Sequence, residues 1–280
     1  MLLSVMNILS VLLSLGVCLL SGWGLHWLWL MPACFVGSFL GQAIFVVSVL
    51  LISVLFIDFN KPQEKDNPFY RLLVKLLVPA VLTVVGARIH AKGFKQVPKD
   101  GRFLLVCNHL HELDPIVLLK YFPNAQLAFI SKQETKKLFV VGPLMHKIMC
   151  QFVNRENDKE ALKTILNCIR LIKEDHASVA VFPEGYIKPD RKLHHFRSGV
   201  FKIATKTNVP IVVCTITNTN HMIRNFKKLK PTHIDLHLVK VIQPEEYEGL
   251  TTVELGEQIY QMMAQDLGPD RVSQEEEEIS

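Results

Sequence analysis

Residues 101–115 read GRFLLVCNHLHELDP, and this stretch decides how the rest of the chain is interpreted. Its apolar part, residues 102–107, has the composition of a buried strand, and it passes directly into a polar cluster that begins at Asn108. In α/β proteins the binding and catalytic groups gather where strands end. The cluster is therefore the first candidate for a functional site.

Short β-rich runs alternate with helical segments on the C-terminal side of this stretch. The clearest helix covers residues 157–175, where apolar residues recur at helical spacing behind Asn157 and Glu160, which resemble a capping box. The alternation predicts an α/β domain with a central mixed β-sheet flanked by helices. We expect strands at residues 102–107, 126–131, 151–154, 177–182, 210–217 and 233–242.

The N-terminal region has a different composition, because residues 1–59 contain no Lys or Arg. The segment Leu2–Leu20 is apolar, and about 20 apolar residues suffice to span a bilayer. A second apolar stretch runs over residues 25–57, and we expect its spanning part near residues 36–57. All three Trp residues lie between the two predicted spans, as in an interfacial aromatic belt: Trp23, Trp27 and Trp29. A cleaved signal peptide is the competing interpretation, but no basic residue precedes the apolar segment.

Positive charge begins immediately after the second apolar stretch, with Lys61, Lys65 and Arg71. The positive-inside rule therefore predicts an integral membrane protein with its catalytic domain on the cytoplasmic face, and we expect a bacterial cell membrane. The net charge is +5, and it is +9 without the acidic residues Glu275–Glu278. A basic body beside a membrane attracts anionic headgroups and phosphorylated substrates, and we expect membrane lipids and no nucleic acid as partners.

These patterns divide the chain into five parts. Residues 1–58 form the membrane anchor, with two predicted transmembrane helices, and the polar residues 59–70 form a linker. An apolar segment that contains Lys75 and Pro79 is too short for a confident crossing, so we expect an interfacial amphipathic helix over residues 71–90. The catalytic domain follows over residues 91–268, with an acidic tail at residues 269–280.

The polar cluster contains a His and an Asp five positions apart, His109 and Asp114. Such a pair can meet across a tight loop, where the carboxylate fixes the imidazole tautomer and leaves the other ring nitrogen to accept a proton. By itself the spacing is weak evidence. Two alternatives stay open at this point: a metal cluster that includes His111 and Glu112, and a covalent mechanism through Cys107.

Two further segments place polar residues after predicted strands. Glu184 and Gly185 follow the apolar run that ends at Phe182, where glycine lets the backbone approach a ligand and a carboxylate binds hydroxyls or orients a base. Arg155 ends the run QFVNR, where a guanidinium suits bidentate capture of a phosphate. Each segment alone also fits an ordinary turn or a solvated charge.

Taken in order, the blocks NHxxxxD, FVxR, FPEG and VPIV over about residues 85–245 resemble the 1-acylglycerol-3-phosphate acyltransferase family. The resemblance implies a glycerolipid acyltransferase-like fold, with His109 as general base and Asp114 as its support. It also implies a substrate-binding role for six positions. These are Asn108 in the same loop, Arg155 for the acceptor phosphate, Glu184 and Gly185, and, in the stretch HHFRSGVFKIA, Arg197 and Gly199 as pocket lining.

The family's Glu-Gly-Thr-Arg block is altered here, because Tyr186 and Ile187 replace the Thr and the Arg. The acceptor is therefore less certain than the chemistry, and Lys188, Arg191 and Arg197 are the nearby cations that could replace the guanidinium. The resemblance implies acyl transfer from acyl-CoA or acyl carrier protein to a lysophospholipid, with no metal or redox cofactor. Nearby backbone amides would stabilise the oxyanion. Glycerol 3-phosphate or another lysophospholipid as acceptor, and a non-catalytic lipid-binding relative, are the alternatives.

Overall fold

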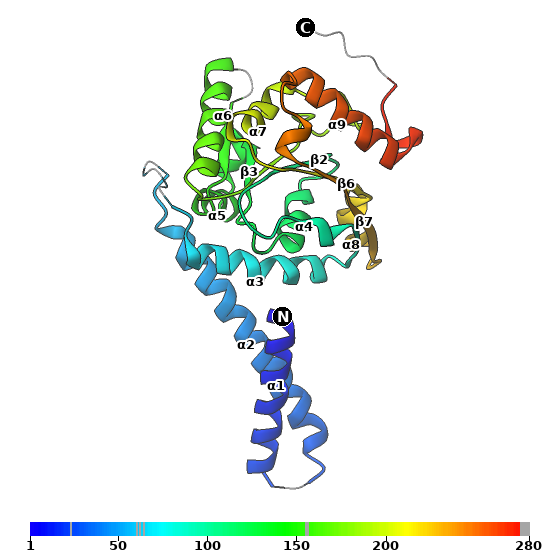
Figure 1. Cartoon of the computed structure of the whole chain (residues 1–280). Helices are drawn as coiled ribbons and strands as arrows, with labels where there is room; N and C mark the ends of the chain where they lie inside the picture. The colour runs from blue at the N-terminus through cyan, green and yellow to red at the C-terminus, as the bar shows by residue number, and fades with distance from the viewer. Residues whose placement is uncertain (23, 60, 62, 64, 155–156, 275–280) are drawn as a thin grey trace.

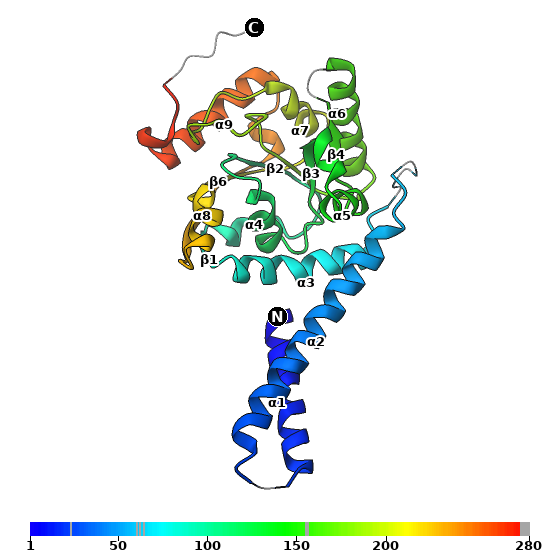
Figure 2. The same cartoon turned by 180° about the vertical axis from the view of Figure 1, so that it is seen from behind.

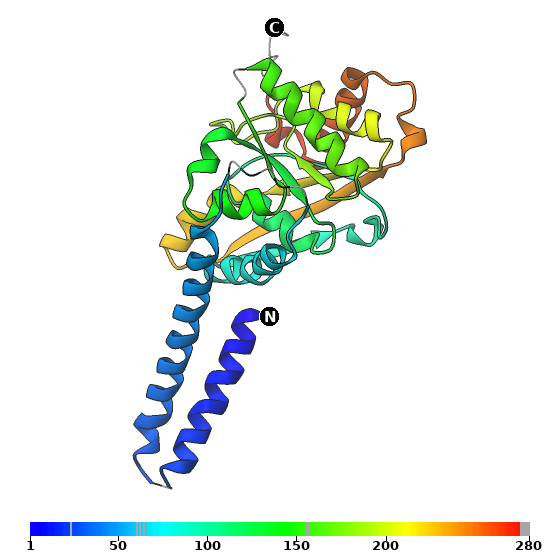
Figure 3. The ribbon, with the colours of Figure 1, turned by 90° about the vertical axis from the view of Figure 1, so that its left-hand side faces the viewer.

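Two apolar helices, α1 (Leu2–Leu20) and α2 (Trp27–Leu55), form a hairpin that projects from a mixed α/β domain (Figures 1 and 3). The computed structural model describes residues 1–22, 24–59, 61, 63, 65–154 and 157–274. Both helices are long and apolar enough to cross a membrane. The predicted first span agrees with α1, whereas α2 begins nine residues before the expected position 36.

Small and polar side chains join the two helices of the hairpin. The buried residues of α1 recur every four positions and so form one stripe: Met6, Ser10, Ser14 and Cys18. The amide of Gln42 in α2 donates a hydrogen bond of 2.9 Å to the hydroxyl of Ser10. Small side chains let two helices approach closely, and hydrogen bonds between them add specificity where lipid surrounds the pair.

The start of α2 differs from the expected aromatic loop. Trp27 and Trp29 lie in the first turn of the helix, and Trp23 lies outside the described residues. The helix continues through Pro32. Proline is tolerated in helices of this kind because neighbouring groups can satisfy the backbone carbonyl that it leaves without a donor.

A seven-stranded sheet forms the centre of the domain, in the order β1-β7-β6-β2-β5-β3-β4. Only the β6–β7 pair is antiparallel, so β2 to β6 run one way and β1 and β7 run the other. The six predicted strands are present, and β1 is an additional strand. The bounds are β1 (Ala87–Lys92), β2 (Leu104–Cys107), β3 (Ala128–Lys132), β4 (Gln151–Val153), β5 (Val179–Val181), β6 (Ile211–Thr217) and β7 (Thr232–Ile242).

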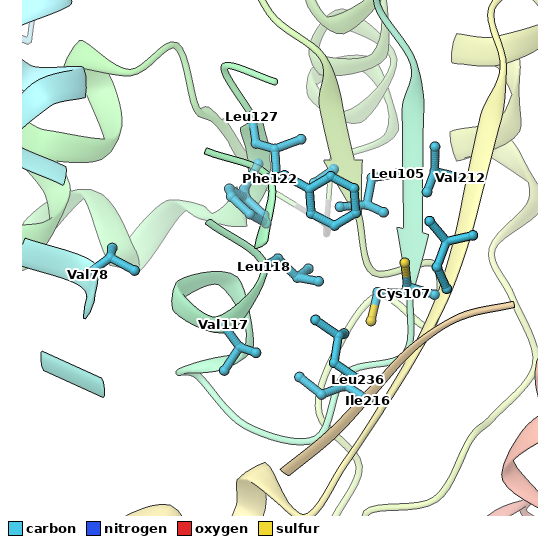
Figure 4. Close-up of a cluster of buried hydrophobic side chains, with 14 of the residues drawn as sticks. Val78, Leu105, Cys107, Val117, Leu118, Phe122, Leu127, Val212, Ile216 and Leu236 are labelled. Atoms are coloured by element: carbon cyan, nitrogen blue, oxygen red, sulfur yellow. The ribbon is translucent and has the colours of Figure 1, made fainter. Parts of the chain in front are cut away.

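Helices cover both faces of this sheet. On the face toward the hairpin lie α3 (Pro68–Val84), α4 (Asp114–Tyr121), α5 (Val141–Lys147) and α8 (Met222–Lys227) (Figures 1 and 2). On the other face lie α6 (Asp158–Lys173), α7 (Lys202–Thr207) and α9 (Thr252–Leu267). Figure 4 shows the core on the hairpin side, where Val78 of α3 and Val117 and Leu118 of α4 point toward Leu105 and Cys107 of β2.

Helix α3 occupies most of the range, residues 71–90, over which we expected an interfacial amphipathic helix, and its bounds differ from the expected ones. It begins at Pro68, capped by the side chain of Asn67, and ends at Val84, so β1 occupies the last residues of the predicted range. Its buried residues recur every four positions and belong to the domain core: Val74, Val78 and Leu82. The domain therefore begins before residue 91. At the other end Leu193 pairs with Val272, so the described start of the predicted tail also packs on the domain.

Candidate active site

The candidate site lies where parallel strands β2 and β5 end side by side. Residues 104–106 of β2 pair with 179–181 of β5, so the segments after Cys107 and Val181 leave the sheet at the same edge. Asn108 holds the first of these segments to β6. Its side-chain amide donates to the carbonyl of Ile216 at 2.9 Å and accepts from the Ile216 N–H at 2.7 Å. Asn108 is buried with both ends of its amide paired, so in this arrangement it positions the loop.

His109 and Asp114 form the pair that the sequence predicted. The imidazole Nδ1 lies 2.9 Å from Oδ2 of Asp114, the first residue of α4. The same oxygen accepts hydrogen bonds from the backbone N–H groups of Leu110 at 2.7 Å and His111 at 2.8 Å. The carboxylate is completely buried. Three donors on one buried oxygen fix both the carboxylate and the ring that it holds.

The remaining nitrogen of His109, Nε2, is the one turned away from Asp114. The imidazole stacks on the ring of Phe182, with 4.1 Å between ring centroids and 17° between the planes, and Phe182 in turn stacks on Phe129 of β3. The His109 side chain keeps 16% of its surface exposed. An oriented imidazole with one nitrogen engaged by a carboxylate can accept a proton at its other nitrogen, which is the chemistry of a general base.

Glu184 supports the His109 loop from the neighbouring strand. Its Oε1 accepts the backbone N–H of His109 at 2.8 Å, and its Oε2 accepts that of His194 at 3.3 Å. Burial raises the pKa of this carboxyl to about 8, although the two N–H donors act in the opposite direction. Because both oxygens are engaged inside the protein, the structure places Glu184 under the loop, where a direct contact with substrate would require these bonds to change.

Gly185 and Arg197 lie against each other. Gly185 has a φ of 85°, and a Cβ at this position would lie 3.0 Å from Nε of Arg197. The glycine thus provides both the left-handed turn and the space for the guanidinium. Two cations lie near the ring of Tyr186: Lys188 Nζ is 4.6 Å and the Arg197 guanidinium carbon 6.0 Å from its centroid. Arg197 and Tyr186 are exposed, so this cluster faces solvent beside the His109 loop.

One predicted residue cannot be placed, and one contributor was missed. Arg155 lies outside the described residues, although β4, which precedes it, runs parallel to β3 and so ends at the same edge of the sheet.

Arg191 has a role that the sequence analysis did not predict, because there it was only one of three cations that could replace the missing Arg of the family block. Its guanidinium donates a hydrogen bond of 2.7 Å to the carbonyl of Leu110, which closes the loop from the side opposite Asp114. No local pattern in the sequence indicates this contact, because 81 residues separate the partners.

The neighbouring backbone amides are unavailable as oxyanion donors in this arrangement. The N–H of His109 donates to Glu184, and the N–H groups of Leu110 and His111 donate to Asp114. The expectation that nearby amides stabilise an oxyanion therefore does not apply to these three. Any donor to the oxyanion must come from other groups around Nε2.

The two alternative sites find little support in the geometry. Within the part of the chain that the structure describes, no three His, Cys, Asp or Glu residues are grouped so that they could hold a metal ion. His111 instead accepts the N–H of Leu113 at its Nδ1. Cys107 is buried in the sheet, and this burial raises the pKa of its thiol well above the ordinary value. A buried, protonated thiol is a poor nucleophile.

Fold and site together define an α/β domain that carries a hydrogen-bonded His109–Asp114 pair and follows a hairpin of two apolar helices. Residues 88–217 match the model of the family described as Acyltransferase. The solved structure of the 1-acyl-sn-glycerophosphate (LPA) acyltransferase PlsC from Thermotoga maritima shares the fold. Its TM-score is 0.62 at 19% identity, over 95% of this chain and 96% of that one.

Curated relatives carry the same family name. A probable 1-acyl-sn-glycerol-3-phosphate acyltransferase of Mycoplasma pneumoniae is 30% identical over 178 residues, which are 62% of this chain and 64% of the relative. The 1-acyl-sn-glycerol-3-phosphate acyltransferase of Borreliella burgdorferi is 26% identical over 188 residues, 65% of this chain and 74% of the relative. The first match spans just under two thirds of that relative's length. The resemblance found in the sequence is confirmed over the matched region: residues 88–217 match the Acyltransferase family model, and the curated relatives are similar over about two thirds of this chain.

Proposed function

We propose that this protein transfers an acyl group from a thioester to the free hydroxyl of 1-acylglycerol 3-phosphate, which gives phosphatidate. The observation that carries the proposal is the His109–Asp114 contact of 2.9 Å, with the carboxylate buried and held by two further N–H groups. The names of the curated relatives support the acceptor. A non-catalytic relative would have no use for a buried carboxylate that orients an imidazole.

In the proposed reaction Nε2 of His109 takes the proton of the acceptor hydroxyl as its oxygen attacks the thioester carbonyl. Asp114 stabilises the imidazolium that forms, because its charge lies against the Nδ1–H. Collapse of the tetrahedral intermediate breaks the carbon–sulfur bond, and the proton on Nε2 passes to the departing thiolate. The acceptor is thus acylated directly, and the chain returns to its starting protonation state without an acyl-enzyme.

The acceptor phosphate is assigned to cations around the His109 loop. Arg197, which lies against Gly185 and near Tyr186, is one such group. Arg155 lies outside the described residues, and its role is the one that the family resemblance implies. Bidentate guanidinium contacts suit a phosphate monoester. The Tyr186 ring fills the place where a smaller residue is usual in the family, and this observation favours a second candidate, an acceptor such as glycerol 3-phosphate or a lysophospholipid with a headgroup.

The proposed setting is a membrane with the domain on its cytoplasmic face. The hairpin of α1 and α2 would hold the enzyme where lysophospholipid and product reside, while acyl-CoA or acyl carrier protein arrives from the aqueous side. A bacterial cell membrane fits the bacterial relatives named above. The reaction as written needs no metal or redox cofactor.

The test is the variant His109→Ala in the full chain, assayed for thiol release with 1-acylglycerol 3-phosphate, glycerol 3-phosphate and lysophosphatidylcholine as acceptors. We expect loss of transfer to every acceptor in a protein that still folds cooperatively, because the partly exposed imidazole packs on one ring and the Asp114 carboxylate keeps its two backbone N–H donors. The unfolding midpoint should fall only by the loss of one hydrogen bond and one ring contact. Near wild-type turnover would refute the mechanism. If the wild-type protein prefers another acceptor, that acceptor replaces 1-acylglycerol 3-phosphate as the proposed substrate, and the proposed mechanism is unaffected.

A further inference from the structure

Helix α8 ends in a tip that exposes apolar and cationic side chains together; we define the α8 tip as residues 223–230. Leu229 is 92% exposed and has a φ of 52°, a conformation that residues with a branched side chain rarely adopt. Ile223 and Phe226 are also exposed, at 39% and 41%. The positive φ belongs to the C-terminal turn of α8, in which the N–H groups of Leu229 and Lys230 donate to the carbonyls of Phe226 and Asn225. The leucine side chain itself buries almost no apolar surface within the chain, and together with Ile223 and Phe226 it forms an exposed apolar group that points to a partner outside the chain.

The charge of the α8 tip is of one sign. The segment MIRNFKKLKP at residues 222–231 contains no acidic residue. Its cations are Arg224, Lys227, Lys228 and Lys230. The partner must therefore accept apolar side chains and carry negative charge over the same surface, and an anionic phospholipid bilayer meets both conditions.

The position of the tip supports the same partner. Backbone atoms of Lys230 and Pro231 lie within 3.6 Å of the place that a Cβ on Gly86 would take, so the tip adjoins the end of α3. The last turn of α3 exposes Val81 and Val84 at 40% and 61%. Figures 1 and 2 show α8 beside the end of α3, in the helical layer that faces the hairpin. The tip thus lies next to exposed apolar residues of α3, on the side of the domain from which the hairpin projects.

We propose that the α8 tip docks into the anionic surface of the bilayer, with Phe226 and Leu229 among the lipid headgroups and the lysines on the phosphates. This contact is separate from the hairpin and orients the domain. Strands β6 and β2 are parallel, so α8, which follows β6, leaves the sheet at the same edge as His109. Docking therefore turns the candidate site toward the lipid, a consequence that rests on the proposed function, whereas the contact itself does not.

The experiment places an environment-sensitive fluorophore at Leu229→Cys in the full chain, reconstituted in vesicles of phosphatidylcholine alone or mixed with phosphatidylglycerol. We expect a blue-shifted emission and quenching by nitroxide-labelled lipid, both stronger with phosphatidylglycerol. The matched control is Val253→Cys, because Val253 is 65% exposed in α9 on the opposite face of the sheet. Unmutated protein treated with the same reagent gives the background from Cys34, the one native thiol that is not buried.

A second variant tests the charge. Replacing Lys227, Lys228 and Lys230 by Gln should weaken docking about fivefold for each lysine, or on the order of a hundredfold together, on vesicles that contain phosphatidylglycerol. On phosphatidylcholine alone the three substitutions should change little. Equal emission from the labels at 229 and 253 would overturn the proposal, and so would docking that does not depend on phosphatidylglycerol. Neither readout requires turnover, so failure of the acyl-transfer proposal would be seen separately.

Discussion

The variant Asp114→Asn isolates the charge of the carboxylate from its geometry. Oδ2 of Asp114 accepts the hydrogen bonds from His109 Nδ1 and from the N–H groups of Leu110 and His111, while Oδ1 is buried and has no partner among the described residues. An asparagine can therefore place its oxygen at the Oδ2 position and keep His109 in place. Its NH2 group would then be buried without an acceptor, which costs about 1–3 kcal/mol of folding stability.

The expected kinetic effect follows from the lost charge. A hydrogen bond to a charged group contributes roughly 1.5–3 kcal/mol. Without the carboxylate charge, the imidazolium that forms in the transition state loses this stabilisation, and kcat should fall about ten- to a hundredfold. The KM values for donor and acceptor should change little, because Asp114 is fully buried and cannot touch either substrate. Thiol release, measured over a range of pH in the full chain, gives kcat and both KM values.

Two comparisons make this prediction refutable. Glu112→Gln applies the same chemical change to an exposed acid of the same loop, and it should leave kcat unchanged. In a double-mutant cycle, Asp114→Asn should have no further effect once His109 is alanine, because the carboxylate acts through the imidazole. A kcat within threefold of the wild type, or full additivity of the two substitutions, would show that the pair does not act as a base.

Arg197→Ala should raise the KM for a phosphorylated acceptor more than the KM for the thioester donor, since the exposed guanidinium lies beside the His109 loop; an equal rise in both would count against the assignment. Arg155→Ala should also raise the KM for the phosphorylated acceptor if both cations bind one phosphate. The variant with the larger rise in that KM, measured in the same assay, identifies the cation that contributes more. For Glu184, burial raises the pKa from 4.5 to about 8, so the folded state binds the proton more tightly than the unfolded state does. Stability from this group is then full below about pH 4.5 and is lost as the pH rises toward 8. Glu184→Gln should be less stable than the wild type at pH 5, with a difference that narrows by pH 8 in chemical unfolding; a constant difference would contradict the shifted pKa.

The strands and the motif were predictable because their signals are local. Apolar runs bounded by polar residues indicated six of the seven strands, and the His109–Asp114 pair meets across one tight loop. Strand β1 was missed since ARIHAK continues an apolar segment and has only a short alternation of its own. It becomes a strand because β7 pairs with it residue by residue from Thr232 onward.

Long-range contacts decided the roles of the residues around the motif. Glu184 lies 75 residues from His109, and only the pairing of β5 with β2 brings its carboxyl under the loop. Asn108, likewise, meets Ile216 across 108 residues of sequence. The sequence analysis predicted substrate contacts for both. In the structure both side chains are buried, and hydrogen bonds to the protein engage both ends of the Asn108 amide and both oxygens of Glu184.

By itself the sequence determined the two apolar helices, the α/β alternation and the contact between His109 and Asp114. Each depends on side chains that lie within a few residues of one another, and neighbours in the chain remain neighbours in space. Only the tertiary structure decided that α3 packs into the core with one face open, that Arg191 closes the His109 loop, and that the α8 tip stands beside α3. These contacts join segments far apart in the chain, and their partners are selected by the order and direction of strands in the sheet, which no local pattern encodes.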